Sequence, residues 1–432
     1  MASSMSSSPN AISDGLPLVN AMSLTLNPYP LILQTIADQQ KSLSHHDLPR
    51  FTTILGVVHA ILFVVAAATL LLKVFRRPDG ERRKIWLWRK HYTSDDQAIP
   101  YLVPNGNFVI EALQMLGCTL YLLFVIFLDW EVRYPDSVPD SVRAGMMFWH
   151  AVALVPGYIA FWLCGWGAFY VVYLAPGRPN KKSTSSKKSP IEHSLVLNTI
   201  CISIPVFITV YFFIIGILMT FKLRQTISTY KLVTLTLNQL STQWKANDPM
   251  RFKNNKRLFD IFTTLSEEVN QMISVAQAEA FGGAAVSIVM ITFYVVTVLA
   301  TSRLVKTSIL IASGRKSVFQ SSESPVESRE TLRSSTATRD SKTKSELPRN
   351  TFTNYISLTR LQRSYYFIII SCGIMAVALG LNFSTNIFFA LKMKVMVIET
   401  KWQAVLIDLV TGTTVTLSLS LFLQSLMLSI WG

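Results

Sequence analysis

Seven long apolar segments decide the fold class of this chain. A helix that crosses the hydrocarbon core of a bilayer needs about 20 mostly apolar residues. Each segment reaches that length with few ionisable side chains, and a helix of a soluble protein rarely stays apolar all round for so long. The segments cover residues 51–74, 107–128, 147–174, 195–221, 281–302, 365–391 and 403–431. The sequence therefore predicts an all-α integral membrane protein with a seven-transmembrane helix bundle.

The net charge of +15 is concentrated in the connections between these segments. Lys and Arg are in excess in cytoplasmic loops, so their distribution orients a membrane protein. The connections after the first, third and fifth spans are basic, whereas residues 1–50 contain only Lys41 and Arg50 as basic residues. We predict an extracellular or lumenal N-terminus and a cytoplasmic C-terminus, in either the plasma membrane or an endomembrane. The charge is thus explained by the lipid bilayer as partner, without nucleic acid.

The connection between spans 4 and 5 departs from the charge pattern and has a structure of its own. Apolar residues recur there at intervals of three and four, at Leu223, Ile227, Tyr230, Val233, Leu237, Leu240 and Trp244, and again at Leu258, Phe262, Leu265, Val269, Met272 and Ala276. Such spacing is typical of amphipathic helices, and Asn247, Asp248 and Pro249 interrupt it. We predict a helical hairpin over residues 222–280 that stands off the membrane, with two separate helices on the lipid surface as the alternative.

Two polar regions lack any apolar period. Residues 1–50 begin with a Ser-rich stretch and predict a disordered or weakly ordered tail, and residues 303–363 predict a mostly disordered, basic loop rich in Ser and Thr. Ser317, Ser324 and Ser335 in this loop are candidate phosphosites. The chain then divides into the tail (1–50), spans 1 to 4 (51–221), the hairpin (222–280), span 5 (281–302), the loop (303–363) and spans 6 and 7 (364–432).

Several polar side chains interrupt the outer halves of the predicted spans. A polar or ionisable group at membrane depth is costly, so it is expected to face the bundle interior. The candidates for a ligand pocket open to the exterior are His59, His150, Asn382, Asn386, Asp408 and Thr411. The alternative is that these groups only form hydrogen bonds between helices.

Small residues and prolines predict details of the packing. Gly282 and Gly283 begin span 5, and Gly373 and Gly380 share one face of span 6, which favours close helix contacts at both places. Pro156 lies inside span 3 and predicts a kink there, because proline cannot donate a helical hydrogen bond.

No motif of an enzyme is found in the sequence. There is no HExxH zinc motif, no Gly-rich phosphate loop and no G-x-S-x-G elbow. The four cysteines all lie inside predicted spans at spacings that suit neither a zinc site nor a disulfide framework. We therefore expect no catalytic residues, no metal site and no cofactor.

Seven spans with an outside N-terminus and a long inner loop after span 5 resemble the plan of G-protein-coupled receptors. The resemblance covers topology alone: residues 173–176 read Tyr-Leu-Ala-Pro where rhodopsin-like receptors have Asp-Arg-Tyr, and span 7 lacks Asn-Pro-x-x-Tyr. The hairpin between spans 4 and 5 resembles that of insect gustatory and odorant receptor channels, which keep it and the N-terminus in the cytoplasm. The sequence favours a receptor-like sensor of a small-molecule ligand that signals to a cytoplasmic partner. A gustatory-receptor-like channel or transporter and a non-catalytic scaffold remain open.

Overall fold

The structure, a computed structural model, describes residues 27–43, 48–75, 87–92, 98–173, 194–245, 250–312 and 347–398, together with residues 405, 409, 412–420 and 422–423. Its helices are α2 (Tyr29–Leu43), α3 (Leu48–Phe75), α4 (Gly106–Arg133), α5 (Asp140–Ala153), α6 (Val155–Tyr173), α7 (Ser194–Gln243), α8 (Arg251–Ala312) and α9 (Leu347–Ile398), and its strands are β1 (Trp88–His91) and β2 (Tyr101–Pro104). The candidate pocket residues Asp408 and Thr411 and the candidate phosphosites Ser317, Ser324 and Ser335 lie outside the described residues.

Six helical stretches among the described residues are long and apolar enough to cross a membrane. They are Pro49–Leu72, Phe108–Arg133, Asp140–Tyr170, Ser194–Gln243, Phe252–Thr307 and Cys372–Met396. Each overlaps one of the first six predicted spans. Of the seventh, residues 405, 409, 412–420 and 422–423 are described, and they are helical. The chain is thus an all-α, multi-pass membrane protein in contact with the lipid bilayer.

Helix α3 shows why these segments suit lipid. Leu55, His59, Leu62 and Ala66 follow one another at helical spacing and are buried against the bundle. On the opposite face, Ile54, Val57, Ile61 and Val64 are each more than half exposed. A continuous exposed apolar face of this kind is rare on a protein in water, whereas hydrocarbon solvates it well.

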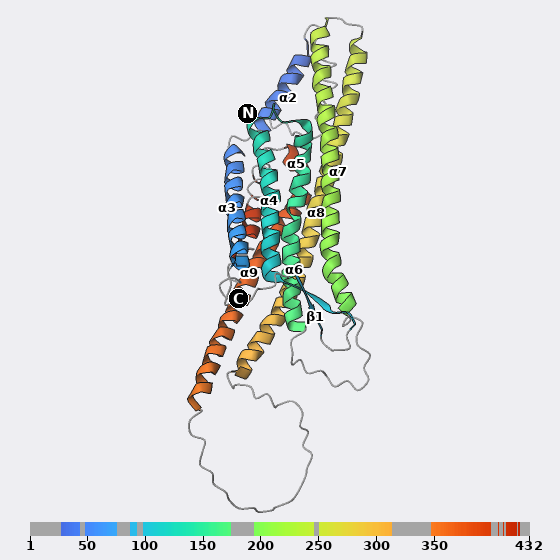
Figure 1. The fold of residues 1–432 in the computed structure, drawn as a ribbon. Coiled ribbons are helices and arrows are strands. Elements are labelled where there is room, and N and C mark those ends of the chain that lie inside the picture. The colour runs from blue at the N-terminus through green and yellow to red at the C-terminus, as the bar shows by residue number, and fades with distance from the viewer. Residues whose placement is uncertain are drawn as a thin grey trace, which may run out of the picture.

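The helices form an elongated bundle (Figure 1). Helix α3 packs chiefly against α4, α4 against α5 and α6, and α8 against α6, α7 and α9. The third membrane stretch is divided into α5 and α6 at Leu154, two residues before Pro156. This break is the predicted kink, because Pro156 has no N–H to bond the carbonyl of Val152.

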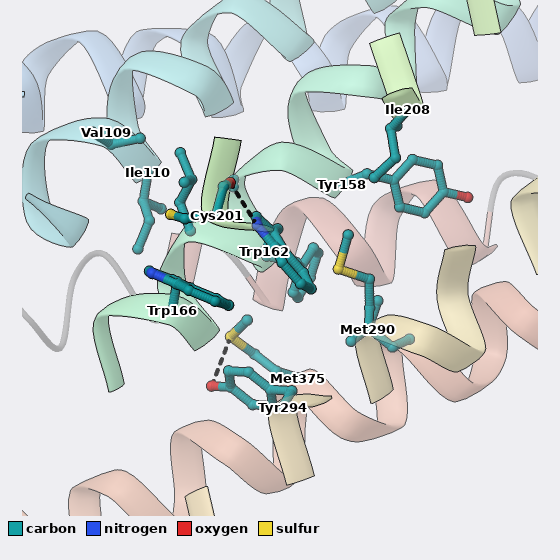
Figure 2. Close-up of a cluster of buried hydrophobic side chains, with 14 of the residues drawn as sticks. Val109, Ile110, Tyr158, Trp162, Trp166, Cys201, Ile208, Met290, Tyr294 and Met375 are labelled. Carbon is teal, nitrogen blue, oxygen red and sulfur yellow. Dashed lines mark hydrogen bonds between the residues drawn. The ribbon is translucent and has the colours of Figure 1, made fainter. Parts of the chain in front are cut away.

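A large aromatic core fills the bundle around α6. Trp162 stacks on Trp166, and Phe293 of α8 packs against both rings. The indole of Trp162 donates a hydrogen bond to the carbonyl oxygen of Cys201 on α7 at 3.0 Å, as Figure 2 shows. Met375 of α9 lies within hydrogen-bonding distance of the Tyr294 hydroxyl in the same cluster. Side chains from α6, α7, α8 and α9 therefore meet in one core cluster.

Helices α7 and α8 extend past the other helices of the bundle at the end where α3 begins (Figure 1). Exposed large apolar side chains are frequent on α7 up to Phe221 and again on α8 from Phe281, and only a few, Leu232, Leu235, Met250 and Phe252, lie between them. We call residues 222–243 and 251–280 the distal segments of α7 and α8. Val233 and Leu237 of α7 are buried in one cluster with Leu258 of α8, and Leu265 packs against that cluster.

Helix α2 lies against the distal segments. Tyr29 is buried in the same cluster as Leu237, and its hydroxyl donates a hydrogen bond to Oδ1 of Asn255 on α8 at 2.8 Å. The Asn27 amide donates to the carbonyl oxygen of Ser241 on α7 at 3.0 Å. The sequence predicted a disordered or weakly ordered tail over residues 1–50 and missed this helix. The apolar face of α2 is short, and a distant segment of the chain completes its packing.

Two short strands, which the sequence did not predict, pair at the opposite end of the bundle. Strands β1 and β2 are antiparallel, with Trp88 opposite Pro104. Asn198 of α7 holds β2 in place: its Oδ1 accepts from the N–H of Leu102 at 2.9 Å, and its amide donates to the carbonyl oxygen of Pro100 at 2.8 Å. The polar group of Asn198 inside an apolar helix is therefore explained by the strand that it binds.

Candidate functional site

His59 is the most deeply buried of the four candidate pocket residues that the structure describes, at 1% exposure. Its Nδ1 lies 2.8 Å from the carbonyl oxygen of Leu55, one turn earlier on α3. Its ring stacks on the phenol ring of Tyr121 on α4, with ring centroids 4.1 Å apart. The contact with Leu55 one turn earlier thus orients the imidazole, and the stack on Tyr121 fixes the plane of its ring.

A cavity of about 70 Å³ opens beside this ring. It lies between α3, α4, α5, α6, α9 and the helical C-terminal residues. Its polar lining consists of His59, Gln114, Tyr121, Tyr158, Thr414 and Ser418, and its apolar lining includes Leu113, Ala153, Leu154, Phe161, Leu379 and Leu417. The sequence predicted His59 but missed the other five polar residues, because only the helix packing brings them together.

Three polar atoms in this lining lack a hydrogen-bond partner among the described residues. They are Nε2 of His59, Oε1 of Gln114 and the hydroxyl of Tyr121. The amide nitrogen of Gln114 is used, since it donates to the carbonyl oxygen of Ser418 at 3.3 Å. His59, Gln114 and Tyr121 are each at most 4% exposed, so none of these three atoms can reach bulk water. Buried polar groups without partners are uncommon and costly, which marks the cavity as a place for a ligand or ordered water.

Asn382 and Asn386 form a buried polar network next to the cavity. The Asn382 amide donates to the Tyr158 hydroxyl and to the Ser287 hydroxyl, both at 2.8 Å. Asn386 donates to the carbonyl oxygen of Asn382 at 2.8 Å and lies against Gly283 of α8. Tyr158 also lines the cavity, so this one side chain joins the asparagine network to it. The close contact predicted at Gly283 is confirmed.

His150 faces a different partner. Its Nδ1 lies 3.2 Å from Oε1 of Glu279 on α8, which is outside the lining of the cavity. The ring of His150 also meets that of Phe124 on α4, at 5.2 Å between centroids. Sequence reasoning placed Glu279 in the connection before span 5 and so missed the pair. An acidic residue three positions before Gly282 in a helix running into the membrane was the available signal.

The structure therefore places the four described members of the predicted six-residue pocket in different surroundings. His59 lines the cavity, Asn382 and Asn386 adjoin it through Tyr158, and His150 forms a separate pair with Glu279. A further contact fastens the cavity's C-terminal wall, where the hydroxyls of Thr385 on α9 and Thr413 lie 2.7 Å apart.

Comparison with known proteins finds no protein that this chain resembles in sequence or structure. No model of a protein family, no curated protein and no solved structure matches the chain. Its function is therefore inferred from its own residues and their geometry.

Proposed function

We propose that the chain is a non-catalytic, receptor-like membrane protein that binds a small molecule in the cavity beside His59. The observation that carries this proposal is the cavity itself. It gathers six polar side chains at membrane depth, where polar groups are costly unless partnered or functional. His59 lies ten residues into the stretch that begins at Pro49, which is about 15 Å along a helix.

The topology that we propose has seven spans with the N-terminus outside. The helical residues 412–420 support a seventh span, and the basic connections support the orientation. In this arrangement the distal segments of α7 and α8 form a hairpin outside the membrane. The burial of Leu237 and Leu258 against each other's helix supports that hairpin.

The packing favours a binding pocket over a continuous pore through one bundle. The aromatic core of Trp162, Trp166 and Phe293 occupies the space between α6 and α8. A ligand that prefers one arrangement of the helices would shift α8 and α9, whose ends carry the connection over residues 313–346. In the proposed orientation this connection is cytoplasmic and is the segment open to a signalling partner and to phosphorylation.

A gustatory-receptor-like channel is the second candidate. The observation that favours it is that α2 and the distal segments lie at the same end of the bundle, as the N-terminus and hairpin do in those receptors (Figure 1). It requires both to be cytoplasmic, the reverse of the orientation proposed above. Accessibility of an N-terminal tag in intact and permeabilised cells separates the two: a tag reached only after permeabilisation overturns the outside N-terminus.

The receptor proposal is tested on the purified full chain in lipid nanodiscs. Small alcohols, amines, ethers and carboxylates are screened for an increase in the unfolding temperature of the chain. A ligand at 100 times its Kd raises the free energy of unfolding by about 2.7 kcal/mol. Spin labels on unnatural amino acids at Lys306 of α8 and Tyr366 of α9, both exposed, then report the distance between these helices. A stabilising compound should change this distance in the unsubstituted chain but not in His59→Phe.

Thr119→Ala is the matched control, because Thr119 is exposed on α4 and its hydroxyl bonds its own helix at Met115. It should respond as the unsubstituted chain does. Stabilisation without a distance change would contradict a receptor and favour a scaffold, and ion flux in reconstituted vesicles would favour the channel.

A further inference from the structure

We propose that the cavity beside His59 takes a small neutral hydrogen-bond donor with an apolar body, of the class of a short-chain alcohol. The inference deepens the proposed function and rests on it for its biological role. It stands on three features of the site: the proton positions on His59 and Gln114, the lack of ionic side chains around them, and the size of the space.

The first feature is the tautomer of His59. A carbonyl oxygen can only accept a hydrogen bond, so the 2.8 Å contact between Nδ1 and the carbonyl oxygen of Leu55 places a proton on Nδ1. In a neutral imidazole the other nitrogen is then an acceptor. Nε2 is the atom that has no partner among the described residues. The ring therefore offers one lone pair to the cavity.

Gln114 offers a second lone pair by the same reasoning. Its amide nitrogen donates to the carbonyl oxygen of Ser418, so the group that remains is the carbonyl Oε1. These two atoms are acceptors, and two acceptors cannot satisfy each other. The Tyr121 hydroxyl, the third atom without a partner, has a single hydrogen and can serve at most one of them. A ligand must therefore bring a hydrogen, and ethers, ketones and other molecules without a donor cannot be full partners.

The second feature is the lack of charge. His59 is the only Asp, Glu, Lys, Arg or His among the residues that line the cavity in the described part of the chain. An ammonium or carboxylate would lose its hydration there without gaining a counter-ion, which costs several kcal/mol. The ligand is therefore neutral, and the leucines and Phe161 in the lining receive its apolar part.

The third feature is size. A cavity of about 150 Å³ in another protein accommodates benzene, with six heavy atoms. The cavity beside His59 has about 70 Å³, which suits a molecule of three or four heavy atoms. A C2 or C3 alcohol meets all three requirements, since its hydroxyl donates to one acceptor and its alkyl group contacts the apolar wall. Water also donates and is neutral, but it is smaller than the space and leaves the apolar wall without contacts.

The test uses 1-propanol and its isomer methoxyethane, which has the same atoms but no donor. The full chain in nanodiscs is labelled with ¹⁵N in the imidazoles of its six histidines, and the His59 signals are assigned by their loss in His59→Phe. Before addition, Nδ1 should carry the proton and Nε2 should have the shift of a nitrogen without a hydrogen bond. 1-Propanol should move the Nε2 signal of His59, whereas methoxyethane and a mock addition should not.

Binding affinities for 1-propanol provide an independent test. The single hydroxyl hydrogen serves one acceptor, so a bond to Nε2 predicts that His59→Phe lowers the affinity about tenfold, the usual effect of one lost hydrogen bond. Gln114→Leu, which removes the acceptor that this hydrogen does not use, and Thr119→Ala should bind as the unsubstituted chain does. Retained thermal stability of His59→Phe shows that its loss is local; if that variant unfolds, the His59 signal in the unsubstituted chain still decides.

The outcomes separate this inference from the proposed function. A shift of Nε2 with 1-propanol and an unchanged distance between Lys306 and Tyr366 supports the donor site and contradicts the receptor. Equal shifts with both isomers, no shift with either, a proton on Nε2, or an Nε2 already hydrogen-bonded by water before addition would each overturn the donor class.

Discussion

The imidazole of His59 on α3 and the phenol of Tyr121 on α4 lie stacked, with their planes inclined by 27°. The row of rings continues from Tyr121 to Phe124 and from Phe124 to His150, which in turn contacts Glu279 on α8. The cavity and the His150–Glu279 pair are therefore connected by side chains in direct contact, although they are separate sites. A ligand that turns the His59 ring would therefore displace the Tyr121 ring first and then the rings that follow it in this row.

Two substitutions of His59 should distinguish its effect on ligand binding from its effect on stability. His59→Phe keeps the stack on Tyr121 and removes a buried acceptor without a partner, so we expect thermal stability to be unchanged or slightly higher. His59→Ala leaves a void and should lower the unfolding free energy by about 2–4 kcal/mol. Both variants should bind the ligand more weakly. Thermal unfolding in detergent together with binding measurements checks this, and a destabilised His59→Phe would show that Nε2 has a partner.

Asn382 should contribute to holding α6, α8 and α9 together. Asn382→Ala removes the bonds to Tyr158 and Ser287, and hydrogen bonds between membrane helices average about 0.6 kcal/mol each. We expect a loss of about 1–2 kcal/mol, since both partners are also left buried. Ser384→Ala on the same helix is the control, because its hydroxyl is exposed and bonds only the carbonyl oxygen of Gly380 within α9. Equal unfolding temperatures of the two variants would contradict the network.

Gly282 should tolerate no larger side chain. A Cβ at this position would overlap the Tyr211 ring, whose hydroxyl donates to the carbonyl oxygen of Ala278 at 2.7 Å. Gly282→Ala must therefore displace the Tyr211 ring and break its bond to Ala278, or move α7 away from α8, and should cost about 1–3 kcal/mol. Gly373→Ala has open space around its Cβ and should be neutral or stabilising by up to about 1 kcal/mol. The unfolding temperatures of the two variants are compared to test this. A Gly282→Ala variant as stable as the unsubstituted chain would contradict the close contact.

The distal segments should respond to charge on one face only. Leu237 is fully buried between α2, α7 and α8, whereas Leu235, two positions away, is 60% exposed. Leu237→Asp buries a carboxylate without a partner and should lower the yield of folded protein severely, as should Leu265→Asp to a smaller degree. Leu235→Asp should leave the helix content by circular dichroism and the expression unchanged. If all three variants behave alike, the distal segments do not pack as a pair.

The membrane stretches and the break before Pro156 were predictable because each depends on residues that are near in sequence. A run of about twenty apolar residues identifies a membrane-spanning helix without reference to the helices around it, and a proline disrupts the helix in which it lies. Contacts at Gly282 were also predictable from two adjacent glycines. The same reasoning failed at Gly373 and Gly380, where the described residues leave open space around a Cβ. A glycine in a helix thus indicates a contact only when another helix passes that face.

The cavity could be predicted only in part because it depends on which helices are neighbours. His59 stood out as an ionisable residue in an apolar stretch. Gln114, Thr414 and Ser418 are ordinary polar residues until α3, α4 and the C-terminal helix bring them to one space. His150 stood out equally, but α5 turns it toward Glu279. Polarity at membrane depth identifies residues that need a partner, and the packing decides whether that partner is a ligand or another helix.

The hydrogen bond from Tyr29 to Asn255 makes α2 a strut between two parts of the chain that otherwise have little contact. Only residues 44–47 separate α2 from α3, the helix that carries His59, and α3 itself packs chiefly against α4. A sliding movement of α3 along α4 would therefore pull on the distal segments of α7 and α8 through α2. With the proposed ligand in the cavity beside His59, this strut would give a mechanical route from the site to the end of the bundle where the distal segments lie.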